Sequence, residues 1–205
     1  MESGMMDLKG LLETRRFKGL EGRAMRDVAS TAAQCIQAMH LSKMVWTDLK
    51  AENLVLMRED EFEPVTDGEN GPVLVKGIDL ESAMPFKDNP VDYSPESCPP
   101  EFAADYMKGV GAYFILEPSY DIWSLGMLLY ECSTGKGYFN GKSPMQMTKA
   151  LRNPNFFPRV EKVKDEKLRD LISQCLKKDP ADRPSITKVL VHPYFLTTGI
   201  GPISF

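Results

Sequence analysis

The stretch WTDLKAENLVL (residues 46–56) gathers charged and amide side chains within a few positions. It follows an apolar run with helical spacing and ends in a short apolar run typical of a strand, so we expect a loop that joins a helix to a strand. Asp48, Lys50 and Asn53 give this loop an acid, a base and a neutral oxygen donor. Taken alone, an Asp-x-Lys pair is typical of a surface ion pair. Its meaning therefore depends on the segments around it.

Composition excludes several classes of protein. The 205 residues are 42% apolar and 26% charged, which is typical of a globular protein. A net charge of -4 with scattered basic residues predicts no nucleic-acid partner. No apolar run approaches the roughly 20 residues of a membrane span, and the first residues do not resemble a signal peptide. We expect an intracellular, cytoplasmic protein of unspecified oligomeric state, whose four separated cysteines remain reduced thiols.

Periodicity predicts a mainly α fold with a small β-hairpin. Helices are expected over 8–13, 23–39, 119–135, 143–151, 165–176 and 183–195, and the helix over 119–135 is apolar on nearly all sides, as a buried central helix should be. Two short strands over 54–57 and 73–75 form the hairpin, with an acidic tip over 58–71. The segment 80–100 has no periodicity, so we expect a long loop there.

Six motifs follow one another in a familiar order. They are VWTDLKAENLVL (45–56), KGIDLE (76–81), SPESCPPE (94–101), YDIWSLG (120–126), CLKKDPADRPS (175–185) and HPYF (192–195). In this order they resemble the C-terminal lobe of a eukaryotic protein kinase, a family of α+β class. The resemblance implies a partial kinase domain over 1–205, comprising hinge and C-terminal lobe, with the catalytic loop at 44–57 and the activation segment at 79–101.

Transfer of a phosphoryl group needs positioning and neutralisation of charge on phosphate oxygens. By the resemblance, Asp48 would accept the proton of a protein substrate's hydroxyl group, and Lys50 would lie against the γ-phosphate. Asn53 and Asp79 would ligate Mg²⁺ through oxygen atoms. The implied cofactors are ATP and Mg²⁺, and the implied activity is that of a protein kinase.

Other matching positions would bind nucleotide or substrate. Glu2 falls in the hinge, Asp7 falls where an acidic residue meets the ribose, and Val55 falls at the floor of the adenine site. A lysine two residues after the catalytic aspartate, together with the hydroxyl of Ser94, fits the serine/threonine branch of the family. Ser94 would position the substrate by hydrogen bonding toward Asp48.

Three matching residues are expected to be structural. Glu101 and Arg183 resemble the family's buried ion pair between the activation segment and the late helices. Asp121, at the start of the central helix, would brace the backbone of the catalytic loop.

The sequence departs from the family pattern in three places. Trp46 and Thr47 stand where the family has His-Arg, so an arginine that pairs with activation-segment phosphate is missing, and phosphorylation of that segment should matter little. Glu81 replaces a glycine after Asp79 and adds a carboxylate near the metal site. The 205 residues also contain no glycine-rich loop, strand lysine or partnering helix glutamate. We therefore expect this polypeptide alone to bind ATP poorly and to transfer phosphate negligibly.

Three interpretations remain open. The first is the catalytic lobe of a serine/threonine kinase, favoured by the presence of all four of Asp48, Lys50, Asn53 and Asp79. The second is a pseudokinase-like module that binds proteins without catalysis, favoured by Glu81 and by the missing N-terminal lobe. The third is an inactive fragment with an exposed apolar cleft.

Overall fold

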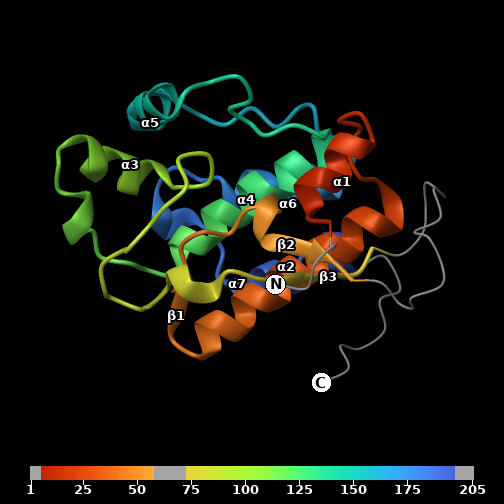
Figure 1. Ribbon diagram of the computed structural model, residues 1–205, viewed down its shortest axis with the longest axis horizontal. Coiled ribbons are helices and arrows are strands. Elements are labelled where there is room, and N and C mark those ends of the chain that lie inside the picture. The colour runs from red at the N-terminus through yellow and green to blue at the C-terminus, as the bar shows by residue number, and fades with distance from the viewer. Residues whose placement is uncertain (1–5, 58–72, 197–205) are drawn as a thin grey trace.

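The central feature of the structure, a computed structural model that describes residues 6–57 and 73–196, is helix α4 (Ser119–Thr134) (Figure 1). Every residue of α4 from 120 to 130 is buried. A helix that is apolar on nearly all sides can be stable only when other elements surround it. The expectation of a buried central helix is confirmed.

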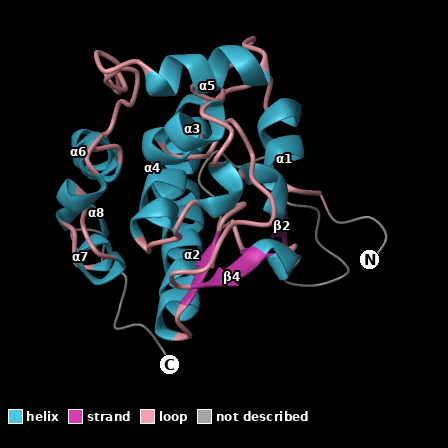
Figure 2. Cartoon of the chain, turned by 90° about the vertical axis from the view of Figure 1, so that its left-hand side faces the viewer, coloured by secondary structure: helices cyan, strands magenta, loops and turns pink. Residues whose placement is uncertain are grey.

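Two long helices pack directly on α4. They are α2 (Gly22–Leu41) and α6 (Glu166–Cys175). Gly126 of α4 allows close approach, because a Cβ at this position would lie 2.7 Å from Cδ2 of Leu176. The short helices α7 (Ile186–Leu190) and α8 (Pro193–Leu196) pack on α2 and α6, and Figure 2 shows α6, α8 and α7 in one column beside α4 and α2.

Two small antiparallel sheets frame the opening stretch. Strand β1 (Met44–Trp46) pairs with β4 (Ala83–Pro85), and β2 (Leu54–Leu56) pairs with β3 (Val75–Gly77). The stretch between β1 and β2 contains a turn of 3₁₀ helix, η1 (Ala51–Asn53), and the stretch between β3 and β4 contains another, η2 (Leu80–Ser82). The pairing therefore brings residues 47–53 and 78–82 together.

The remaining helices lie at the edges of this core. Helix α1 (Leu8–Thr14) contacts η1 and β2, while α3 (Pro100–Met107) packs against α5 (Pro144–Arg152) at the end of the molecule away from the strands (Figure 2). Helix α5 begins with a capping box at Ser143 and Gln146, followed by Pro144 at the first helical position, as the sequence predicts. Two further 3₁₀ turns are η3 (Gly111–Tyr113) and η4 (Pro180–Asp182).

The mainly α prediction is confirmed, and two of its details are wrong. The single helix expected over 183–195 is two helices, because Arg183 is extended, Ser185 caps α7, and Pro193 cannot donate the hydrogen bond that would continue it. The loop expected over 80–100 contains η2 and β4, whose strand is too short to show periodicity. The hairpin is present with its second strand two residues later than expected.

Other expectations have mixed outcomes. All four cysteines are free thiols, as expected. No helix in the described part of the chain is both long and apolar enough to cross a membrane. The acidic segment 58–71 and Glu2 lie outside the described residues.

Candidate functional site

The start of the stretch 46–56 is anchored from the centre of the molecule. The Oδ2 atom of Asp121, a fully buried residue in the first turn of α4, accepts hydrogen bonds from the backbone N–H of Trp46 at 2.9 Å and pairs with Nε2 of His40 at 2.9 Å. Burial raises the pKa of the Asp121 carboxyl group, while His40 and the Trp46 N–H oppose this rise. Asp121 thus ties β1 to the start of α4.

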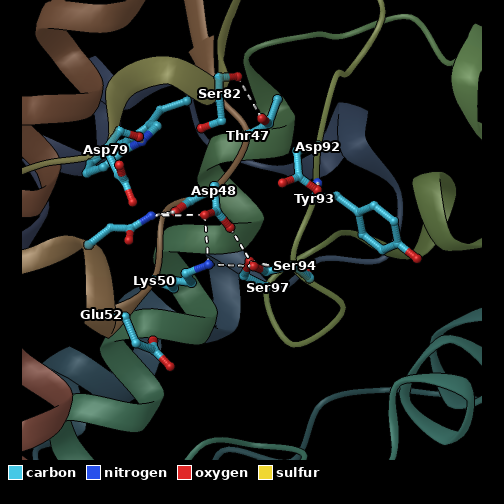
Figure 3. A network of polar contacts seen from close by, with 12 residues as sticks. Thr47, Asp48, Lys50, Glu52, Asp79, Ser82, Asp92, Tyr93, Ser94 and Ser97 are labelled. Atoms are coloured by element: carbon cyan, nitrogen blue, oxygen red, sulfur yellow. Dashed lines mark hydrogen bonds and ion pairs between the residues drawn. The ribbon is translucent and has the colours of Figure 1, made fainter.

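Asp48 lies at the centre of a polar network (Figure 3). Lys50 Nζ donates to Oδ2 of Asp48 at 2.7 Å and to Oγ of Ser94 at 2.9 Å. The Ser94 hydroxyl group donates to Oδ1 of Asp48 at 2.5 Å. Two side chains from distant segments, Lys50 and Ser94, therefore meet at the carboxylate of Asp48.

Asn53 completes the network from η1. Its Nδ2 donates to the backbone oxygen of Asp48 at 2.8 Å and to Oδ2 of Asp48 at 3.0 Å. Both bonds use the amide N–H groups, so neither occupies the amide oxygen of this buried residue. The backbone N–H of Ile78 donates to the Asn53 carbonyl at 2.9 Å, which brings the end of β3 and the following Asp79 beside Asn53.

Asp79 has an unusual backbone conformation. Its φ and ψ of 60° and 50° lie in the left-handed region, which aspartate tolerates better than most residues and which is enriched at functional sites. The side chain is exposed, and its carboxylate makes no hydrogen bond or ion pair within residues 6–57 and 73–196. Figure 3 shows Asp79 and Ser94 on opposite sides of Asp48.

The donor atoms of Asn53 and Asp79 suit a hard cation. A carboxamide oxygen and a free carboxylate are oxygen ligands that Mg²⁺ accepts, and Mg²⁺ in such sites usually takes its other ligands from phosphates and water. Among the described residues no group of three or more His, Cys, Asp or Glu side chains could enclose a metal ion. The two residues therefore fit a cation that is shared with a phosphate ligand better than a closed structural metal site.

The segment after Asp79 is held to the core at several points. The hydroxyl group of the fully buried Thr47 donates to the carbonyl of Ser82 at 2.9 Å. Further along, Ser124 Oγ of α4 donates to the carbonyl of Ser97 at 3.0 Å. Glu81, directly before Ser82, is exposed.

Arg183 and Glu101 form a bidentate ion pair at the end of this segment. Nη1 and Nη2 of Arg183 donate to the two carboxylate oxygens at 2.6 and 2.7 Å. The remaining N–H groups reach the carbonyls of Lys177, Lys178 and Ser119, and the guanidinium group lies 5.1 Å from the ring centroid of Trp123. Arg183 thereby joins α3, the start of α4 and the turn before α7.

Asp7 and Val55 are neighbours through their backbones, which form a single antiparallel bridge. Oδ1 of Asp7 accepts the backbone N–H of Gly10 at 2.7 Å and so caps α1. Val55 is 8% exposed. The structure brings these two residues together on the side of α1, although one carboxylate oxygen of Asp7 is already bound by the helix cap.

Glu131 is a further titratable residue beside this site that was not predicted from the sequence. This half-buried residue of α4 lies among Glu52, Glu96 and Lys9, and Lys9 forms an ion pair with Glu52. Burial, reinforced by Glu52 and Glu96 and opposed by Lys9, raises the pKa of Glu131 to about 7. A signal was present, because Glu131 is the single acid within the apolar run that follows Asp121 in α4.

Comparison with known proteins gives concordant matches. The family model described as "Protein kinase domain" matches residues 1–195. Tribbles homolog 1 of Mus musculus is 25% identical over 173 residues, which cover 84% of this chain and 42% of that protein. Germinal center kinase 3 of Caenorhabditis elegans is 27% identical over 192 residues (89% and 30%), and serine/threonine-protein kinase Nek5 of Homo sapiens is 30% identical over 159 residues (78% and 20%). The chain spans less than half the length of each of these relatives.

Proposed function

Since this chain belongs to the protein kinase domain family, we propose that it carries the catalytic lobe of a serine/threonine kinase. The reaction would transfer the γ-phosphoryl group of ATP to a serine or threonine hydroxyl group of a protein. One observation carries the proposal, namely the convergence of Lys50, Asn53 and Ser94 on the carboxylate of Asp48.

Each side chain has a separate task in this reaction. The substrate hydroxyl oxygen attacks the γ-phosphorus of ATP while Asp48 takes the hydroxyl proton. The bond between the γ-phosphorus and the oxygen that bridges to the β-phosphate breaks, and ADP leaves. Lys50 offers a positive charge to the developing negative charge on the phosphoryl oxygens. Asn53 and Ser94 hold Asp48 in orientation, so that less reorganisation is needed during transfer.

Asn53 and Asp79 would hold Mg²⁺ through the amide oxygen and the free carboxylate. The ion would supply charge neutralisation at the phosphates. In this proposal Val55 forms the floor beneath adenine, Asp7 faces the ribose, and Glu2 belongs to the hinge. Turnover further requires an N-terminal lobe with a glycine-rich loop and a strand lysine, which the 205 residues do not contain.

The proposal is tested by phosphotransfer from Mg-ATP to peptides that contain serine, threonine or tyrosine. The 205-residue chain alone should show negligible turnover, whereas the chain joined to an N-terminal lobe that supplies a glycine-rich loop and a strand lysine should phosphorylate serine and threonine. Robust turnover by the 205-residue chain, or no turnover by the joined protein, would contradict this partial-domain assignment.

Two variants of the joined protein test the role of Asp48. Asp48→Asn should lower kcat by at least about 100-fold, because a general base typically contributes that much or more. Asp105→Asn is the matched control, since Asp105 forms only a surface ion pair with Lys108, and its turnover should not change. Unchanged activity of Asp48→Asn would remove Asp48 from the mechanism.

A protein-binding module without catalysis is the second candidate. The observation in its favour is Glu81, an exposed carboxylate two residues after Asp79 at a position where the family pattern has glycine. In the joined protein, Glu81→Gly should strengthen Mg-ATP binding if Glu81 impairs a nucleotide site. A joined protein that neither binds Mg-ATP nor gains binding from Glu81→Gly would favour the binding module.

A further inference from the structure

A cluster of five aromatic rings lies next to the Asp48 network. Its members come from the segment 79–101, from α3, from the stretch after η3 and from α4, and they are Tyr93, Phe102, Tyr106, Phe114 and Tyr120. The Tyr93 ring centroid is 4.8 Å from that of Phe102 and 4.8 Å from that of Tyr106, with tilted planes in both pairs. Such tilted pairs are attractive beyond the burial of their surface.

Tyr93 is adjacent in sequence to Ser94, the residue that binds Asp48 and Lys50. The backbone carbonyl of Ser94 also accepts the N–H groups of Ser97 at 3.1 Å and Cys98 at 3.0 Å, which closes a turn. In Figure 3 the Tyr93 ring points away from Asp48 while Ser94 faces it. Neighbouring residues therefore contact the aromatic cluster on one side and the polar network on the other.

The partners of Tyr93 are themselves fixed. Phe102 is 2% exposed and lies edge-on to Phe114 and Tyr120, at centroid distances of 5.3 and 5.8 Å. Its neighbour Glu101 is bound by Arg183, and Tyr120 precedes Asp121, which holds the N–H of Trp46. Tyr93 thus packs on α3, and Phe102 of α3 in turn contacts Tyr120 of α4.

We propose that Tyr93 is a positioning residue whose ring, packed against Phe102 and Tyr106, keeps Ser94 on Asp48 and Lys50 without a bound phosphate. The positioning of Ser94 in catalysis rests on the proposed function. Thr47 offers a hydroxyl group to the segment, so it supplies no cation that could bind a phosphate and order the segment. Ring packing by Tyr93 supplies a permanent restraint instead.

Amide hydrogen exchange of the 205-residue chain tests the restraint directly, because the Ser97 and Cys98 amides report on the turn at Ser94. Tyr93→Ala should accelerate exchange at these two amides at least tenfold while amides of α4 are unchanged. Tyr93→Phe retains the ring and should stay within twofold of the unmodified chain. Tyr113→Ala is the matched control, since Tyr113 is 76% exposed and lies outside the cluster, and should change neither amide.

Three outcomes of the exchange experiment overturn the proposal. They are unchanged exchange in Tyr93→Ala, equal acceleration in α4, and acceleration by Tyr93→Phe that equals that of Tyr93→Ala. None of these readouts requires turnover, so the restraint on Ser94 can be established or rejected even if the chain proves not to be a kinase.

Steady-state kinetics of the joined protein test whether the restraint by Tyr93 matters for catalysis. Tyr93→Ala should lower kcat/KM for the protein substrate at least tenfold with little change in KM for Mg-ATP. Tyr93→Phe should keep the kcat/KM of the unmodified protein. Unchanged kcat/KM in Tyr93→Ala, or an equal loss in Tyr93→Phe, would overturn the positioning role. Absence of turnover in the unmodified protein would instead contradict the proposed function and remove the catalytic part of the inference.

Discussion

Thr47 shows how one residue changes the way a loop is held. It is fully buried, and its hydroxyl group binds the carbonyl of Ser82 at 2.9 Å, at a position where the family pattern has arginine. An arginine there would need a phosphate partner to hold the segment, whereas a hydroxyl–carbonyl hydrogen bond exists as soon as the chain folds. The Thr47–Ser82 hydrogen bond involves no charged group and requires no phosphorylation of the segment.

Replacing Thr47 by valine keeps the shape and removes the hydrogen bond. The partly buried Ser82 carbonyl is then left without this donor, so we expect a loss of about 1–3 kcal/mol in the free energy of unfolding. Thr14→Val is the control, because the Thr14 hydroxyl makes a similar bond to Leu11 at the exposed surface and its loss should cost less than about 0.5 kcal/mol. Urea denaturation measures both, and equal losses would refute this view of Thr47.

Glu131 should make stability depend on pH. Its pKa is raised from 4.5 to about 7, first by burial and then by Glu52 and Glu96. Between these two values the unfolded chain releases the proton while the folded chain keeps it, so the free energy of unfolding falls as pH rises. The fall should be at most about 3 kcal/mol and should level off above pH 7.

The variant Glu131→Gln should remove this contribution and flatten the stability curve between pH 4.5 and 7. Glu13→Gln, at an exposed position of α1, should leave the slope unchanged. Denaturant unfolding at a series of pH values measures the slopes. Parallel curves for Glu131→Gln and the unmodified chain would show that Glu131 does not titrate in this range.

At the scale of elements, the Glu101–Arg183 pair fixes the position of α3 against the segment between α6 and α7. The arginine side chain is 0% exposed and all of its N–H groups have acceptors, so its charge is fully compensated. Because Glu101 ends the segment 79–101, the pair also fixes where that segment terminates. The element pairs β1–β4 and β2–β3 fix its beginning in the same way, through backbone hydrogen bonds.

Arg183→Met should lower the free energy of unfolding by about 3–5 kcal/mol, since it removes the buried arginine and leaves the half-buried Glu101 carboxylate without its partner. As the control, Arg23→Met at an exposed position of α2 removes a 3.7 Å pair with Asp27 and should cost about 1 kcal/mol or less. Urea denaturation compares the two. The double variant Glu101→Gln/Arg183→Met should lose less than the sum of the single variants, and strict additivity would argue against coupling.

At the scale of the whole molecule, one hydrophobic core joins the helices and both small sheets. It contains Trp46 of β1 and Trp123 of α4, the two tryptophans of the chain, and both are 0% exposed. Because these residues lie in different elements of the same core, they should lose their packing together when the chain unfolds.

Tryptophan fluorescence and far-UV circular dichroism should therefore report one cooperative unfolding transition with a common midpoint. Trp46→Phe leaves Trp123 as the single fluorescent tryptophan, and Trp123→Phe leaves Trp46. In each variant the midpoint by fluorescence should equal the midpoint by circular dichroism. Separate midpoints for the two reporters would show that the core is divided. A soluble chain with a single transition would also count against the interpretation of this chain as an inactive fragment.

Local sequence is enough to predict most of the helices and to place the polar side chains of residues 46–56 near one another. Apolar spacing and local caps such as Ser143 specify a helix from neighbouring residues, and Asp48, Lys50 and Asn53 are close because the chain keeps them within one short loop. Long-range packing, by contrast, sets the pairing of β1 with β4, the partner of Thr47, the environment of Glu131 and the contact of Ser94 with Asp48, 46 residues away. Three-residue strands are too short to show a periodicity, and contacts between distant segments depend on how helices pack around α4.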